Sequence, residues 1–146
     1  MATIRLEVVT PERLVLEDDA DIVIARGAEG DLGVLHGHEP LITPLPIGEL
    51  TYRKGSEDRH LAISGGFLEV RPDKVVVLAD VAERSEEIDR ERAEEARRRA
   101  EAALAEHKGT ELEAAAAASL QQALLRLRVA ERRRVHERPA PPRQEG

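Results

Sequence analysis

Few side chains in this sequence have the types and spacing that catalysis or metal binding requires. His36 and His38 are two residues apart, as metal ligands often are, but the pattern offers no third ligand within reach and the chain has no cysteine. Ser64 precedes two glycines and has no obvious histidine or aspartate partner, which favours a turn residue over a nucleophile. We therefore expect no catalytic residue, no metal site and no enzymatic activity of the chain itself.

The arginines of the second half offer a different chemistry, the binding of anions. Residues 114–138 contain six arginines against two glutamates. Guanidinium groups bind phosphate and carboxylate oxygens through bidentate, charge-assisted hydrogen bonds. Nucleic acid is disfavoured as the partner, because residues 1–84 carry 9 Lys/Arg against 16 Asp/Glu and only Tyr52 and Phe67 could stack on bases. The basic segment therefore favours an acidic protein surface.

Residues 1–84 have the two-residue periodicity of short β-strands. Ile4, Leu6 and Val8 alternate with other side chains, and further short β-branched runs follow, separated by Gly, Pro and Asp. Pro72-Asp73 lies between two such runs and predicts the turn of a β-hairpin. Short strands with turn residues at this spacing predict a β-sandwich or barrel.

The periodicity changes to that of helices at about residue 85. Ser85 fits an N-cap, glutamates follow in the first turn, and strong helix formers continue to Lys108. Gly109 predicts the end of this helix, and Thr110 with Glu113 has the spacing of a capping box that opens a second one. Because the joining turn is short, we expect an antiparallel two-helix hairpin.

Alanine dominates the faces that the two predicted helices turn toward each other. The first helix presents Ala93, Ala96, Ala100, Ala103 and Leu104. At roughly 25 cal/mol per Å² of buried apolar surface, an alanine contributes well under half as much as a leucine. The hairpin should therefore be marginally stable alone and able to rearrange at small energetic cost.

These patterns define the fold class as all-β plus α, with three parts. We expect a β-sandwich over 1–84, a helical hairpin over 85–136, and a disordered, proline-rich tail over 137–146. No apolar run approaches the length of a membrane span, and the N-terminus lacks the pattern of a signal peptide. We therefore expect a cytosolic protein, or one bound peripherally on the cytosolic side of a membrane.

The combination of these motifs resembles the epsilon subunit family of the bacterial F-type ATP synthase. The motifs that carry the resemblance are Gly30-Asp31-Leu32-Gly33, Gly37-His38, Ser64-Gly65-Gly66-Phe67-Leu68-Glu69-Val70 and Ile88-Asp89-Arg90-Glu91-Arg92-Ala93. The resemblance covers residues 3–130, and it departs at His36, where the family usually has proline. It implies a non-catalytic subunit of the rotating central stalk. Its partners would be the gamma subunit, the ring of c subunits and the alpha/beta catalytic hexamer.

The resemblance also implies which loop meets the membrane ring. In the family, the loop corresponding to residues 29–43 touches the c subunits, and we carry Glu29, Asp31 and His38 over to this c-ring and gamma interface. The glycines of the same loop have a simpler explanation, since they can supply the positive φ angles of turns. The implied location is the cytoplasmic side of the bacterial cell membrane, without a membrane span of its own.

A second implication concerns ATP as a regulatory ligand. Some members bind ATP between the hairpin helices through an Ile/Leu-Asp-x-x-Arg-Ala motif, which Ile88, Asp89, Arg92 and Ala93 match here. Glu83 matches a further family position, Arg99 lies two turns beyond the motif, and Arg126 on the return helix could close the site. Ala115 and Gln122 stand at positions that are basic in strong ATP binders, so the implied binding is weak and no cofactor is required. The alternative is a helix whose arginines and glutamates are simply solvated.

A third implication is inhibition of ATP hydrolysis by the hairpin. In an extended state, the second helix would reach acidic surface on the catalytic beta subunits through Arg126, Arg128, Arg132, Arg133 and Arg134. ATP would favour the compact state through its differential affinity. Two other functions stay open from the residues alone: a free-standing nucleotide-binding sensor, and a structural β-sandwich adaptor with a helical clamp.

Overall fold

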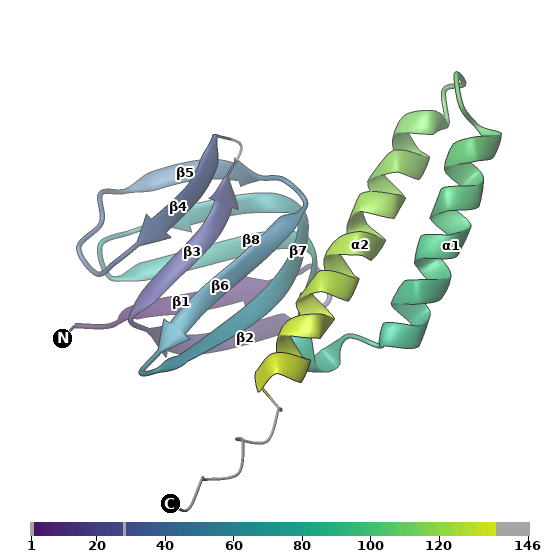
Figure 1. Cartoon of the computed structure of the whole chain (residues 1–146). Coiled ribbons are helices and arrows are strands. Elements are labelled where there is room, and N and C mark those ends of the chain that lie inside the picture. The colour runs from purple at the N-terminus through teal and green to yellow at the C-terminus, as the bar shows by residue number, and fades with distance from the viewer. Residues whose placement is uncertain (1, 28, 137–146) are drawn as a thin grey trace, which may run out of the picture.

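The computed structural model describes residues 2–27 and 29–136, except for the side chains of 133–136. A β-sandwich is followed by two long antiparallel helices that lie beside it (Figure 1). The strands are β1 (Ile4–Val9), β2 (Leu14–Ala20), β3 (Ile22–Gly27), β4 (Gly30–Val34), β5 (Leu41–Leu45), β6 (Gly48–Lys54), β7 (Glu57–Val70) and β8 (Lys74–Arg84). A short 3₁₀-helix, η1 (Ser85–Glu87), leads into α1 (Arg90–Glu106) and α2 (Glu113–His136). The predicted fold class is confirmed.

The strands form one folded sheet that encloses the main core. Their order is β2-β1-β8-β7-β6-β3-β4, and β5 pairs with β7. All these pairs are antiparallel except β1 with β8. Alternate residues point inward, as Ile4, Leu6 and Val8 do on β1, and the core they form is aliphatic apart from Tyr52.

Strand β7 contributes to both layers of the sandwich because its backbone bends near the middle. Leu61 and Ile63 point into the core before the bend, whereas Leu68 and Val70 do so after it, so the inward-facing positions change parity. Gly65 and Gly66 supply the positive φ angles, 76° and 129°, that this change requires. Ser64 therefore lies within a continuous strand, and its prediction as a turn residue is wrong.

The turn between β7 and β8 is confirmed at Pro72-Asp73. The amide of Arg71 donates to the carbonyl of Lys74 at 2.8 Å, which closes the hairpin around these two residues. Proline and aspartate suit this position because proline fixes φ and aspartate readily adopts turn conformations. Local sequence was sufficient to place this turn.

The start of the first helix differs from the prediction. Ser85 begins η1, and α1 starts later, with Asp89 as the N-cap whose carboxylate accepts the amide of Arg92 at 3.2 Å. The reason is tertiary. Arg13 of the β1–β2 turn holds the Glu87 carboxylate with two hydrogen bonds of 2.9 Å, and Ile88 is buried against α2. These contacts fix the chain before it can continue as an α-helix.

The second helix begins near the predicted capping box. The hydroxyl of Thr110 accepts the amide of Leu112 at 3.2 Å, and the Glu113 carboxylate accepts the amide of Gly109 at 3.2 Å. Gly109 has a φ of 79°, as expected for the glycine that ends the preceding helical segment. The α-helix itself starts at Glu113 rather than Thr110.

We expect Glu87→Gln to lower the free energy of unfolding by about 1–2 kcal/mol at neutral pH, less than the full pKa shift implies because Arg13 is partly exposed. Hydrogen bonds from Arg13, and then from Arg84, lower the pKa of Glu87 from 4.5 to about 2. Because the folded-state pKa is depressed, this stabilisation is present above 4.5 and is lost as the pH falls toward about 2. Urea unfolding across this range measures it.

The matched control is Glu57→Gln, which alters a carboxylate that is 64% exposed and whose ion-pair partner among the described residues is its strand neighbour Arg59. This control should change stability little at any pH. If the two variants and the native chain unfold at the same urea concentration at neutral pH, the Arg13–Glu87 contact does not stabilise the fold.

Candidate functional site

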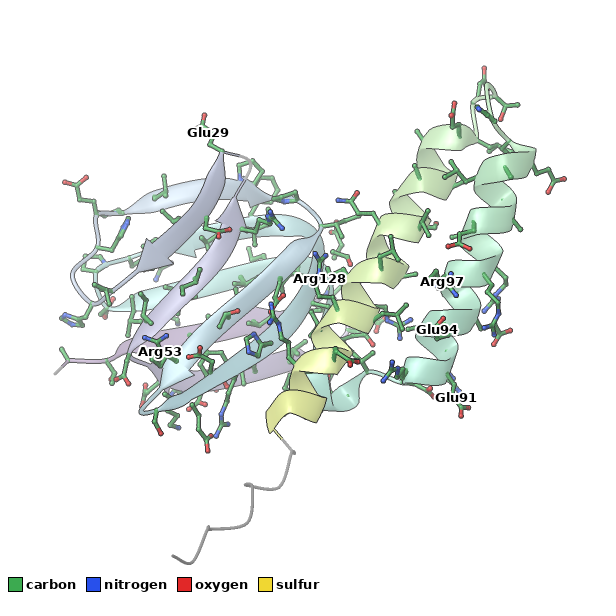
Figure 2. The ribbon with its side chains drawn as sticks, in the orientation of Figure 1. Glu29, Arg53, Glu91, Glu94, Arg97 and Arg128 are labelled. Atoms are coloured by element: carbon green, nitrogen blue, oxygen red, sulfur yellow. The ribbon has the colours of Figure 1, made fainter. Side chains whose placement is uncertain are left out.

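The sequence-predicted interface residues lie at two separate places on the sandwich. Glu29 is at the tip of the β3–β4 turn, where Figure 2 shows it pointing away from the sheet, and Asp31 is exposed on β4. His38 lies beyond the opposite end of β4, half-buried, with Nδ1 at 2.7 Å from the carbonyl oxygen of Glu39. The structure therefore keeps Glu29 and Asp31 near one another but places His38 apart from Glu29.

The loop that carries His38 is anchored to the far end of the sandwich. Gly37 has a φ of 89°, and its amide donates to the carbonyl of Pro72 at 2.6 Å, in the β7–β8 turn. Within the described ranges, no three His, Cys, Asp or Glu side chains are placed so that they could hold a metal ion. The loop is thus a positioned surface feature of the sandwich.

A row of apolar side chains crosses the outer face of the sheet, and sequence reasoning missed it. We call this feature the apolar row. Its members are register partners on five strands, Pro44 with Phe67, Phe67 with Leu78, Leu78 with Val9, and Val9 with Leu14. Register partners point to the same face. Phe67, Leu78 and Leu14 are 55%, 51% and 53% exposed, so the row is open to solvent.

An exposed row of this kind is typical of a surface that another protein covers, since isolated soluble domains rarely leave contiguous large apolar side chains in water. A signal existed in the sequence. The run Val75-Val76-Val77-Leu78 is apolar at inward-facing and outward-facing positions alike, although only Val75 and Val77 point into the core. The row itself depends on the strand order, because β1 must lie beside β8 to continue it.

A hollow of about 440 Å³ separates the hairpin from β8. Its lining residues are Val81, Glu83, Ala96, Ser119, Gln122, Ala123 and Arg126. The Arg126 guanidinium spans the hollow and binds the Glu83 carboxylate, with Nε–Oε1 at 2.7 Å and Nη2–Oε2 at 3.2 Å. Two of the seven candidate ATP residues are thus brought together, but they are bonded to each other.

The other five candidates do not line this hollow. Ile88 and Ala93 are buried, and they pack in the hairpin interior and against α2. Asp89 caps α1, while Arg92 is 82% exposed and Arg99 is 72% exposed. The structure therefore does not assemble the seven residues into one pocket. Sequence spacing places Arg92, Ala93 and Arg99 on one helix, but it cannot show which side of that helix faces the hollow.

Helix α1 carries the network of charges that the alternative interpretation expected. Arg97 bonds Glu94 at 3.0 Å and Glu101 at 2.8 Å, and Figure 2 shows Glu94 and Arg97 together on this helix. Arg99 lies 3.7 Å from Glu95. Pairs at these helical spacings are solvated and each stabilise a helix by only about 0.3–0.5 kcal/mol.

The basic residues of α2 divide into paired and unpaired ones. Arg132 binds Glu49 of β6, with Nε–Oε1 at 3.0 Å, and Glu49 also lies 2.9 Å from Nδ1 of His60. Burial raises the pKa of Glu49, but the hydrogen bonds from His60 and Arg132 outweigh burial and lower it. Arg128 is exposed and forms no ion pair with any side chain in the described part of the chain. The side chains of Arg133 and Arg134 lie outside the described residues.

These features define a class of protein before any comparison. The chain is a β-sandwich with an uncovered apolar row, joined to a small-residue helical hairpin that is docked on the sandwich through ion pairs. Neither α1 nor α2, over the described residues, is long and apolar enough to cross a membrane. The features are those of a subunit that binds other proteins.

Comparisons with known proteins identify the family. The model of the ATP synthase delta/epsilon chain β-sandwich domain matches residues 3–85, and that of the delta/epsilon chain long alpha-helix domain matches residues 86–131. The chain therefore belongs to the ATP synthase delta/epsilon family, and the resemblance drawn from its motifs is confirmed.

Two relatives named ATP synthase epsilon chain match along 98% of their own length. One from Dehalococcoides mccartyi is 53% identical over 137 residues, which is 93% of this chain and 98% of that protein. One from Moorella thermoacetica is 52% identical over 131 residues, which is 89% of this chain and 98% of that protein. A solved chain in the OSCP/F1/c-ring structure of the Euglena gracilis mitochondrial ATP synthase is 27% identical, with a TM-score of 0.74, over 90% of this chain and 82% of that one.

Proposed function

We propose that this protein is a non-catalytic rotor subunit, the epsilon subunit in the central stalk of an F-type ATP synthase. In that position it couples proton transport to ATP synthesis. The observation that carries the proposal is the match of both domains, in order, to epsilon chains over 93% of this chain. It favours a stalk subunit over a free-standing nucleotide sensor or an unrelated adaptor.

The surfaces of the sandwich suit the partners of such a subunit. We assign the apolar row to the gamma subunit, because a broad, exposed apolar face fits a permanent protein interface. Glu29 and Asp31, at the β3–β4 end, and His38, at the β4–β5 loop, are assigned to the contact with the c-ring and gamma. Binding there would hold the protein peripherally on the cytoplasmic side of the bacterial cell membrane.

We further propose that the hairpin is a regulatory arm that inhibits ATP hydrolysis. The docked hairpin already uses Arg126 and Arg132 against sandwich carboxylates, so a released hairpin would present these cations, with Arg128, to acidic surface on the catalytic subunits. The small apolar contact between hairpin and sandwich supports a low cost of release.

The test is ATP hydrolysis by the catalytic head assembled with gamma and either the full chain or a chain ending at Glu87, which keeps the Arg13 contact. We expect the shortened chain to assemble and hydrolysis to rise severalfold. Equal rates would rule out an inhibitory arm under those conditions and leave the stalk role standing. Failure of both chains to assemble with gamma would contradict the stalk role.

ATP remains a proposed regulatory ligand, of weak affinity, in the hollow beside β8. Arg126 is the cation best placed for phosphate there, but it is occupied by Glu83, and Gln122 adds no charge. We expect Glu83→Gln to free Arg126 and tighten ATP binding by roughly tenfold, the size of one charge-assisted hydrogen bond. Calorimetric titration with Mg-ATP measures this effect.

The control for the ATP measurement is Glu83→Gln combined with Arg126→Ala, in which the gain should disappear. Weaker binding by Glu83→Gln alone would mean that Glu83 contacts the ligand directly, as the family resemblance implies. Equal heats from all three proteins at high ATP concentration would leave the hollow without a nucleotide role.

A further inference from the structure

The docked hairpin touches the sandwich through two ion pairs on one helix. Arg126 of α2 binds Glu83 of β8, and Arg132 of α2 binds Glu49 of β6. The two arginines are thus held by two strands that lie on either side of β7. Both carboxylates are largely withdrawn from solvent, since the Glu83 and Glu49 side chains are 22% and 16% exposed.

The apolar contact between the two parts is small by comparison. The second apolar cluster consists of Ala62, Ile88, Leu125, Val129 and Ala130, with Ile47 packed against it. Only Ala62 and Ile47 of this cluster belong to the sandwich, and one of them is an alanine. Apolar burial at this interface therefore contributes little, at roughly 25 cal/mol per Å².

The interior of the hairpin adds no compensating anchor. The buried positions between α1 and α2 are mainly alanines, Ala93, Ala100, Ala116 and Ala123, and they hold the helices to each other rather than to the sheet. Figure 1 shows α2 between the sandwich and α1, so the ion pairs of α2 join the helices to the sandwich, whereas the Arg13–Glu87 pair anchors only η1, which precedes the helices.

We propose that Glu83–Arg126 and Glu49–Arg132 form a two-point electrostatic clasp that holds the hairpin docked and occupies its arginines. The clasp prevents the two arginines from binding an external anionic surface, because each is already bound to a carboxylate of the sandwich. Docking is therefore sensitive to ionic strength, since the Debye length falls from roughly 10 Å at 0.1 M salt to roughly 3 Å at 1 M. It does not require a nucleotide.

The consequence for regulation rests on the proposed function, because an acidic partner would have to compete with Glu83 and Glu49 for the same two arginines. The clasp itself is a property of the isolated chain. A test on the isolated chain can therefore contradict the clasp without contradicting the stalk assignment. The stalk assignment can likewise be contradicted while the clasp stands.

The experiment measures docking by energy transfer between two fluorophores. The chain has no cysteine, so Ser56→Cys in the β6–β7 turn and Leu124→Cys in the middle of α2, the helix next to the sandwich, give two unique attachment sites on exposed residues. The clasp variant is Glu49→Arg with Glu83→Arg. Its control is Glu29→Arg with Glu39→Arg, which makes the same charge change at two exposed glutamates that lie elsewhere on the sandwich.

In 0.1 M salt we expect high transfer in the native chain and in the control. In the clasp variant the ratio of docked to released hairpin should fall by roughly a hundredfold, about tenfold for each pair. Moving the native chain to 1 M salt should release it in part. Adding Arg126→Glu and Arg132→Glu to the clasp variant reverses both pairs and should restore docking.

Two outcomes overturn the clasp. One is a clasp variant that remains docked like the native chain at both salt concentrations. The other is a fourfold charge-reversed chain that stays released although its circular dichroism and thermal unfolding match those of the native chain. The first outcome would mean that the apolar cluster alone fixes the hairpin, and the second that attraction between these two pairs of charges is not what docks it.

Discussion

Gly66→Ala is expected to lower the free energy of unfolding by about 3 kcal/mol or more, enough to leave a marginal domain largely unfolded. A Cβ atom added at Gly66 would overlap the carbonyl oxygen of Leu78 and lie 2.8 Å from the Cα of Ala79. Both are backbone atoms of β8, so no side-chain rotation can relieve the overlap. The φ of Gly66, 129°, adds strain that no L side chain avoids.

The matched control for this prediction is Gly55→Ala in the β6–β7 turn. Gly55 also has a positive φ, 66°, but an added Cβ would meet no atom within 4 Å. Gly55→Ala should lower the free energy of unfolding by about 1 kcal/mol, from the left-handed conformation alone. Urea unfolding of both variants separates the two terms, and equal losses of stability would show that β7 and β8 can move apart without cost.

Gly66 also illustrates how far sequence reasoning reaches. The Ser64-Gly65-Gly66 run was recognised as a backbone feature, but its local pattern predicted a turn. The structure instead keeps one strand from Glu57 to Val70 that bends between two layers of the sandwich. Local sequence indicates that positive φ angles are needed at these glycines. The packing of β7 against β8 decides whether those angles make a turn or a bend within one strand.

Helix boundaries show the same division between local and long-range causes. The capping residues Thr110 and Glu113 lie close to the helix they initiate, and the second helix was predicted to within a few residues. The first helix was not, because Glu87 is held by Arg13, 74 residues earlier in the chain. The rules that predict where a helix starts consider only neighbouring residues, so they cannot predict a 3₁₀ segment that depends on a partner this far away in the sequence.

The candidate site follows the same pattern. Sequence spacing correctly places Arg92 and Arg99 on one helix, which Asp89 caps rather than joins, yet the hollow is lined by Glu83 and Arg126, which are 43 residues apart and bonded to each other. The apolar row likewise arises only when β1 lies beside β8 and β5 beside β7. Sequence gives the chemistry of these residues, and strand order decides which of them meet.

Phe67→Glu combined with Leu78→Glu is expected to weaken binding of the gamma subunit at least a hundredfold. The two residues are register partners in the middle of the apolar row and are 55% and 51% exposed in the isolated chain. At the centre of an interface, each would lose its apolar contact and bury an unpaired carboxylate, at about 2 kcal/mol or more per site. Binding of labelled chain to the gamma subunit of the same ATP synthase measures the loss.

The control must add the same two charges to similarly exposed apolar residues outside the row, and Leu112→Glu combined with Leu124→Glu does so on the hairpin, at 55% and 46% exposure. Because Phe67 and Leu78 point away from the core, the double variant should unfold at nearly the native urea concentration, which separates a lost interface from a lost fold. Native affinity in the folded double variant would remove the apolar row from the gamma interface. The assignment of Glu29, Asp31 and His38 would then have to account for stalk binding by polar contacts alone, with a strong dependence on salt that an apolar interface does not show.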